Sequence, residues 1–276
     1  MERILLFSSP ADDAYDPYLR GHVAEPPLGL LYLCSGLERS PLCQEFFLID
    51  GYLRPSEVKS LEEAVSKKKA TQLWISFMST EGPRCFGDQA RKLKEKFPGL
   101  KIVAGGSFFR GLSKSLIHSN FPEYDLIVIG DPDLEIDNIL EARGIYVSRP
   151  LTSFLEVPYP RRDLVNLSDY FANDRLPHHL IIGARGCSGR CTFCAISCRN
   201  PYLRNPQEVA LEIQYLYATT GIPAFSLIDD VMAIRPERFE KYKRHLRPLP
   251  SSVQLDISWR IDRFSEKIAD ELAGLH

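Results

Sequence analysis

Short runs of apolar residues alternate with amphipathic stretches along the first half of the chain. The apolar runs predict buried strands at residues 3–7, 45–49, 73–77, 101–104 and 125–129. Between them, apolar residues recur every three or four positions, which predicts helices at residues 27–37, at 60–69, around Phe86, Ala90, Leu93 and Phe97, and at 112–119. Five strands separated by helices indicate a parallel sheet covered on both faces. With right-handed crossovers this is a doubly wound α/β domain.

The second half resumes the alternation after a stretch interrupted by prolines. Further strands are predicted at residues 180–182, 224–228 and 252–258, and helices at 206–220, around Phe239, Tyr242 and Leu246, and around Ile268, Leu272 and Leu275. Three strand–helix units are typical of part of a (β/α) barrel, whose functional side chains lie at the carboxyl ends of the strands. We therefore expect a first domain at residues 1–146, a linker at 147–178 and a second domain at 179–276.

Composition and charge exclude several classes of protein. The 276 residues are 44% apolar and 25% charged, as in an ordinary soluble globular protein. A net charge of −2 gives no electrostatic footprint for nucleic acid. No apolar run is long enough to span a membrane, and the N-terminal one is too short for a signal peptide. We expect a cytoplasmic protein with no membrane or nucleic-acid partner.

Three closely spaced cysteines provide the main candidate chemistry. Cys187, Cys191 and Cys194 follow directly on the predicted strand at 180–182. A cluster of four irons has four corners to ligate, so three cysteines would leave one iron open to bind and reduce a substrate. Cys198 could instead close a four-cysteine site for zinc or a cluster. Disulfides are less favoured, because seven cysteines is an odd count and nothing else marks a secreted chain.

The pattern Cys-x-x-x-Cys-x-x-Cys, preceded by Arg185-Gly186, resembles the signature of the radical S-adenosylmethionine superfamily. The resemblance implies that the three cysteines hold a [4Fe-4S] cluster and are the catalytic ligands. The open iron would be chelated by S-adenosylmethionine, whose sulfonium is cleaved by an electron from the cluster to give a deoxyadenosyl radical. It also implies that Phe193 lies near this cofactor, and that a flavodoxin or ferredoxin supplies the electron.

Polar residues follow the next two predicted strands. Asp229 and Asp230 come after the strand at 224–228, and Arg260 comes after the strand at 252–258. By the same resemblance, the acidic pair would accept a hydrogen bond from the amino group of S-adenosylmethionine. Arg260 would clamp the methionine carboxylate with its planar fork of donors. Structural alternatives are that an aspartate caps a turn and that Arg260 pairs with Asp262.

Small residues follow three strands of the first domain, where ligands of doubly wound sheets bind. The residues are Ser76, Ser79, Thr80, Gly105, Gly106 and Gly130. Their order, together with Pro26-Pro27-Leu28-Gly29-Leu30, resembles the flavodoxin-like cobalamin-binding domain that precedes many radical enzymes. Cobalamin is therefore an expected cofactor. No Asp-x-His-x-x-Gly motif is present, so no histidine would ligate cobalt from below. Alternatively, the glycines simply make tight turns.

Together these features predict a radical S-adenosylmethionine enzyme for cobalamin-dependent methylation, or a related radical modification, of a small molecule or peptide. The radical family normally has six strand–helix units, so three suggest a fragment or a barrel completed by a second polypeptide, with a degenerate barrel as the less favoured alternative. An alternative is an RNA methylthiotransferase, although Cys34, Cys43 and Cys85 are too widely spaced for a convincing second cluster. Another alternative is a sensor or scaffold that binds cobalamin or a cluster without catalysis.

Overall fold

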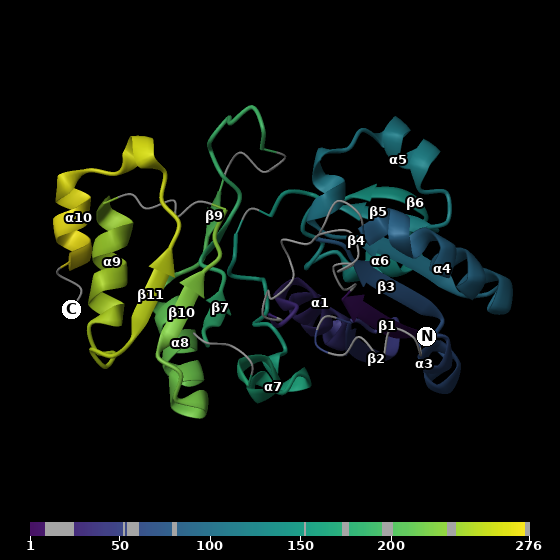
Figure 1. Cartoon of the computed structure of the whole chain (residues 1–276), viewed down its shortest axis with the longest axis horizontal. Coiled ribbons are helices and arrows are strands. Elements are labelled where there is room, and N and C mark those ends of the chain that lie inside the picture. Colours follow the sequence, from purple (N-terminus) through teal and green to yellow (C-terminus); the bar gives the residue numbers. More distant parts are fainter. Residues whose placement is uncertain are drawn as a thin grey trace. The chain divides into compact units, whose positions relative to one another are not determined.

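The chain folds into two compact units, shown in purple to teal and in green to yellow in Figure 1. The computed structural model describes residues 1–8, 25–51, 53, 61–78, 82–151, 153–172, 177–194, 201–230 and 236–273. Unit 1 comprises Met1–Pro150 and Val157–Tyr170, and unit 2 comprises Leu151–Glu156 and Phe171–His276. Among the described residues, no helix has the length and apolar character needed to cross a lipid bilayer.

Unit 1 is built on a six-stranded parallel sheet with the order β2-β1-β3-β4-β5-β6. The strands are β1 (Glu2–Ser8), β2 (Cys43–Asp50), β3 (Gln72–Ser76), β4 (Lys101–Gly105), β5 (Leu126–Ile129) and β6 (Gly144–Val147). The doubly wound α/β fold is confirmed. The order reverses between β1 and β3, and ligands of such sheets bind at this reversal, beyond the carboxyl ends of the strands.

Side chains on alternate sides of the strands form two apolar cores. Ile4, Leu6 and Trp74 face the core that contains α1 (Leu28–Arg39) and α6 (Ile136–Glu141). Leu5, Phe7, Leu73 and Ile75 belong to the other core, with α3 (Leu61–Lys68), α4 (Gly82–Lys96) and α5 (Lys114–Asn120). Both faces of the sheet are therefore covered, as the apolar strand runs indicate.

The sixth strand corrects the expectation of five strands. Strand β6 pairs in parallel with β5, and the short helix α6 makes the connection between them. The sequence does not predict either element, because both are short and the β6 side chains are partly buried at the two central positions and exposed at the two ends. An edge strand of this kind lacks the continuous apolar run that identifies a buried parallel strand.

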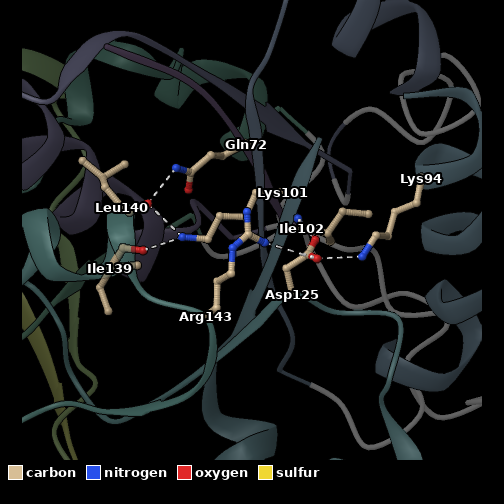
Figure 2. Close-up of polar contacts among 8 residues, drawn as sticks. All are labelled: Gln72, Lys94, Lys101, Ile102, Asp125, Ile139, Leu140 and Arg143. Carbon is tan, nitrogen blue, oxygen red and sulfur yellow. Dashed lines mark hydrogen bonds and ion pairs between the residues drawn. The ribbon is translucent and has the colours of Figure 1, made fainter. Parts of the chain in front are cut away.

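A buried lysine organises the amino-terminal edge of the sheet. Lys101 is 6% exposed, and its Nζ donates to the carbonyls of Ile139 and Leu140 at 2.9 and 2.8 Å. The Gln72 amide donates to the Leu140 carbonyl at 3.0 Å (Figure 2). These carbonyls belong to the last turn of α6, where a cation is favourable. Burial, assisted by the nearby charge of Arg143, lowers the pKa of Lys101 to about 8.

Part of the proline-rich stretch packs within unit 1. The Ser35 hydroxyl donates to the carbonyl of Tyr159, and Arg161 forms ion pairs with Glu38 and Asp163. Further along, the Tyr170 hydroxyl donates to Asp50 at 2.6 Å. The elements of this stretch are the 3₁₀ helix η2 (Arg162–Leu164) and the helix α7 (Leu167–Phe171).

Unit 2 contains a three-stranded parallel sheet with the order β11-β10-β7. Its strands are β7 (His179–Ile181), β10 (Ala224–Leu227) and β11 (Gln254–Ile257), and its helices are α8 (Pro206–Thr220), α9 (Pro236–Leu246) and α10 (Glu266–Ala273). The short strands β8 (Ala184–Arg185) and β9 (Tyr202–Leu203) pair antiparallel. Helix α8 begins after its N-cap Asn205, whose side chain accepts from the Gln207 amide, and ends at Gly221 in a left-handed conformation.

Candidate functional site

The three cysteines lie on the loop that follows β7 and β8, at the carboxyl end of the unit 2 sheet. Cys187 is buried, and Cys191 and Cys194 are partly exposed. Phe193 is 91% exposed, so it is not a core aromatic of this unit. Cys198 lies outside the described residues.

Hydrogen-bond donors point at two of the sulfurs. The Gly189 amide donates to Cys187 Sγ at 3.3 Å, and Arg260 Nη1 donates to Cys191 Sγ at 3.5 Å. A Cβ atom at position 189 would lie 2.5 Å from Arg260 Nη1 and 3.2 Å from Cys187 Sγ. Glycine at 189 therefore lets the guanidinium reach this loop. Donors of this kind orient cysteine sulfurs that could ligate metal.

The three cysteines on this loop are free thiols in the structure. Among the residues that the structure describes, no group of three or more His, Cys, Asp or Glu side chains is arranged to hold one ion. In a four-iron cluster each thiolate ligates a different iron, so the sulfurs need not converge on one point. Three free thiols on one loop, two of them with donors, fit that requirement.

The two aspartates after β10 contact the backbone at the base of the cysteine loop. Asp229 Oδ1 accepts from the amides of Gly183 and Ala184 at 2.6 and 2.8 Å. Asp230 Oδ2 accepts from the Gly186 amide at 2.7 Å. Asp229 is 7% exposed, whereas Asp230 is exposed. The accessible Asp230 carboxylate is therefore better placed than Asp229 to meet a ligand from solvent.

Arg260 follows β11 and makes a two-point contact with Asp262, with distances of 2.9 and 2.8 Å. This hydrogen bonding raises the pKa of the guanidinium above its ordinary value. The anticipated pairing with Asp262 thus exists, and Nη1 is directed at Cys191 at the same time. Since β7, β10 and β11 are parallel, the residues that follow them lie at one edge of the sheet.

The glycines at the carboxyl edge of the unit 1 sheet are of two kinds. Gly106 and Gly130 have φ angles of +104° and +106°, which L side chains rarely adopt. A Cβ at Gly106 would collide with the backbone of Phe77, and one at Gly130 with the Ser148 hydroxyl. Backbone geometry alone accounts for these two. Gly105 has room for a Cβ, with Val128 O as the nearest atom at 3.7 Å.

Other side chains at this edge give it a polar character. Ser76 is partly buried at the end of β3, and Ser79 and Thr80 lie outside the described residues. Arg110 Nη2 donates to Asp131 Oδ1 at 2.6 Å. Arg110 Nε is the buried side-chain nitrogen or oxygen that lacks a hydrogen-bond partner among the described residues. An unpaired buried donor is costly, so this edge fits a ligand that carries an acceptor group.

Sequence reasoning missed Arg110 as well as the buried pair of Arg204 and Glu212 in unit 2. Arg204 Nη1 donates to Glu212, and the two side chains are 4% and 5% exposed. A signal was present for this pair, because Glu212 interrupts the apolar face of α8 formed by Val209, Ile213 and Leu216. A charge on a buried helix face requires a partner.

Comparisons with known proteins detect a likeness in structure only. No family model matches the chain, and no curated protein matches it. The cobalamin-dependent S-adenosylmethionine radical enzyme OxsB, solved with aqua-cobalamin, aligns with a TM-score of 0.75 at 14% identity. The radical S-adenosylmethionine methyltransferase TsrM from Kitasatospora setae, solved with cobalamin and a [4Fe-4S] cluster, aligns with a TM-score of 0.69 at 17% identity.

These alignments cover 100% of this chain, but only 42% of the OxsB chain and 57% of the TsrM chain. Apo OxsB gives a TM-score of 0.69 at 13% identity. The chain therefore has the α/β fold found in solved cobalamin-dependent radical S-adenosylmethionine enzymes, over about half the length of those proteins.

Proposed function

We propose that this chain is part of a radical S-adenosylmethionine enzyme that uses cobalamin to methylate, or otherwise modify by radical chemistry, a small molecule or peptide. The observation that carries the proposal is the loop of three cysteines at the carboxyl end of β7. It lies in a chain that aligns over its whole length with OxsB and TsrM. Neither the fold nor the cysteine pattern alone would be as specific.

In this proposal, Cys187, Cys191 and Cys194 hold a [4Fe-4S] cluster, and the Gly189 amide and Arg260 donate hydrogen bonds to the sulfurs of Cys187 and Cys191. When bound, the cluster supplies the electron that cleaves S-adenosylmethionine. The exposed Asp230 accepts from the amino group of the cofactor, and the exposed ring of Phe193 covers one side of it. Arg260 already holds Asp262, so a methionine carboxylate would share or replace that partner.

Cobalamin would bind beyond the carboxyl edge of the unit 1 sheet, next to Gly105, with Ser76, Ser79 and Thr80 contributing polar contacts. The unpaired Nε of Arg110 would donate to an acceptor group of the cofactor. The roles of Gly106 and Gly130 are to shape the backbone of this edge. An external flavodoxin or ferredoxin would reduce the cluster.

The RNA methylthiotransferase alternative is disfavoured by the state of Cys34. This thiol is fully buried in α1, and burial raises its pKa to about 12. Its side chain belongs to the apolar core formed with Leu30 and Leu37 of the same helix. A second cluster in unit 1 would therefore have to form without Cys34.

The metal content tests the proposal directly. Anaerobically reconstituted protein should contain about four irons and four sulfides per chain. Cys187→Ala, Cys191→Ala and Cys194→Ala should each abolish the cluster, whereas Cys43→Ala, on β2 of unit 1, is the matched control and should not. Loss of the cluster in Cys198→Ala as well would indicate a closed four-cysteine site in place of an open iron.

Turnover separates a catalyst from a sensor. Reduced, reconstituted protein mixed with S-adenosylmethionine should release 5′-deoxyadenosine or a demethylated product, detected by chromatography and mass spectrometry. A protein that binds the cluster and cobalamin but consumes no S-adenosylmethionine would support the sensor or scaffold interpretation.

A further inference from the structure

The stem of the cysteine loop, residues 182–186, is hydrogen-bonded by residues of two other parts of unit 2, Asp229 after β10 and Arg204 before α8. On one side, Asp229 Oδ1 accepts from the amides of both Gly183 and Ala184. These two residues and the carboxylate are buried. A Cβ atom at Gly183 would lie 2.8 Å from the Tyr242 hydroxyl and 3.1 Å from Asp229 Oδ2, so glycine is what allows the carboxylate this close.

On the other side, Arg204 contacts the carbonyls of the same segment. Its amide donates to Gly183 O at 2.9 Å, and its Nη1 donates to Ile182 O at 3.3 Å. Glu212, one turn further along α8 than Glu208, pairs with the same guanidinium and is equally buried. The two peptide groups that flank Gly183 are thus each bonded twice. Their N–H groups donate to Asp229, which follows β10, and their carbonyls accept from Arg204, which precedes α8.

Stability alone is a weak reason for this arrangement. Buried ion pairs cost desolvation energy, and apolar residues of similar volume are often equally stable in their place. Apolar side chains could not, however, accept from the Gly183 and Ala184 amides or donate to the Ile182 carbonyl, as Asp229 and the Arg204 guanidinium do. The bond from the Arg204 amide to Gly183 O is made by the backbone and does not depend on the side chain. The segment ends directly before Cys187, which is itself buried. Groups that orient metal ligands in this indirect way commonly change metal affinity when they are removed.

We propose that Asp229 and the Arg204–Glu212 pair are positioning residues that clamp the stem of the cysteine loop and present Cys187 to the cluster. The inference rests on the proposed cluster at this loop, and it assigns Asp229 to the loop and not to S-adenosylmethionine. Asp230, which bonds to Gly186 and remains exposed, keeps its separate role toward the cofactor.

Substitution of Asp229 tests one side of the clamp. Asp229→Ala removes the acceptor for two amides and should weaken iron retention against a chelator by roughly 10- to 100-fold. Asp229→Asn keeps one acceptor oxygen and should restore most of the affinity and the wild-type electron paramagnetic resonance spectrum of the reduced cluster. Asp256→Ala, on the exposed face of β11, is the matched control and should behave as wild type. Equal retention by the alanine and asparagine variants would overturn the proposal.

The other side is tested by Arg204→Met/Glu212→Met, which removes both charges and leaves neither one buried alone. Circular dichroism should show that the double variant is folded. Its iron retention against the chelator should be weaker than that of wild type. A folded double variant with wild-type retention and spectrum would show that the pair serves stability only.

In the unmodified chain, the Gly183 and Ala184 amides should be among the slowest of unit 2 to exchange with deuterium. Fast exchange there would also overturn the clamp.

A readout without the cluster separates this inference from the proposed function. In apo protein, alkylation of Cys187, followed by peptide mass spectrometry, should be faster in Asp229→Ala than in wild type, Asp229→Asn or Asp256→Ala. Buried Cys34 in unit 1 serves as the internal reference. If wild-type chain binds no iron, the proposed function fails, but the alkylation rates still decide whether the clamp holds the loop. Unchanged rates in Asp229→Ala would refute it.

Discussion

Gly105 and Gly106 are adjacent in the sequence but have different reasons to be glycine. Gly106 has a positive φ angle and lies against the backbone of Phe77, where a side chain has no space. Gly105 faces ordinary van der Waals space next to Val128. A pair of small residues at a strand end can therefore combine a requirement of the fold with a surface that is free for a ligand.

The two glycines should respond differently to alanine. Gly106→Ala should lower the free energy of unfolding of unit 1 by roughly 1–3 kcal/mol, because it adds both strain and a backbone collision. Gly105→Ala should unfold as wild type does. Urea denaturation followed by Trp74 fluorescence in a Trp259→Phe background measures unit 1 separately, since each unit holds one tryptophan. Equal stability of the two variants would contradict this explanation. Because Gly106 variants would be destabilised, a change in cobalamin affinity can be attributed to the binding surface only in Gly105 variants.

Lys101 should give unit 1 a distinctive dependence on pH. Its pKa is about 8 in the folded chain and has an ordinary value of 10.5. Between these values the unfolded chain binds more protons, so this group makes the free energy of unfolding rise with pH. The stability of wild type relative to Lys101→Met should therefore increase between about pH 7 and about pH 10, measured by Trp74 fluorescence as above. A difference that does not change with pH would show that Lys101 titrates normally.

At the scale of elements, the parallel strands of unit 2 gather chemistry that is scattered in the sequence. The cysteine loop, the Asp229-Asp230 pair and Arg260 follow three different strands, and hydrogen bonds connect both the aspartates and Arg260 to the loop or its stem. Helix α8 takes part through Arg204, which immediately precedes its N-cap, and through Glu212 within it. The start of α8 is therefore both a helix terminus and a support for the loop.

The N-cap of α8 should contribute measurably to the stability of unit 2. The Asn205 side chain accepts from the Gln207 amide at 3.1 Å. Asn205→Ala removes this acceptor and should cost roughly 0.5–2 kcal/mol. Asn205→Ser supplies another oxygen and should recover most of the loss. Trp259 fluorescence in a Trp74→Phe background would report these changes. An unchanged free energy of unfolding in Asn205→Ala would mean that the cap does not stabilise unit 2.

At the scale of the whole molecule, each unit has its own sheet. Both apolar cores described for unit 1 are formed by residues between Ile4 and Tyr146. Residues 157–170 add polar contacts to this unit through Tyr159, Arg161 and Tyr170. The expected boundary at residue 146 therefore leaves out a segment that packs with the first unit.

Truncation should reveal what that segment contributes. A chain of residues 1–170 should fold and unfold cooperatively, with a denaturation midpoint close to that of the Trp74 transition in the full chain. A chain of residues 1–150 lacks the contacts to Ser35, Glu38 and Asp50 and should be less stable, since each lost hydrogen bond contributes about 1 kcal/mol. Identical midpoints for the two chains would mean that residues 151–170 add nothing to the stability of unit 1.

The sequence by itself determined the central strands of both sheets, the main helices and the cysteine motif. Apolar runs and helical spacing are local properties, so they predicted the doubly wound fold and the strand that leads to Cys187. The same locality explains the misses. Strand β6 is a half-exposed edge strand with a weak pattern, and the partner of a buried charge such as Glu212 is not marked in the chain around it.

Only the tertiary structure decided which groups meet. Asp229 and Asp230 are neighbours in the sequence, but one is buried against the loop stem and the other is exposed. Arg260 lies far along the chain from Cys191, and Arg204 reaches back to Ile182 across the loop. Such contacts depend on the parallel register of strands that are distant in sequence, and no local pattern of residues specifies that register.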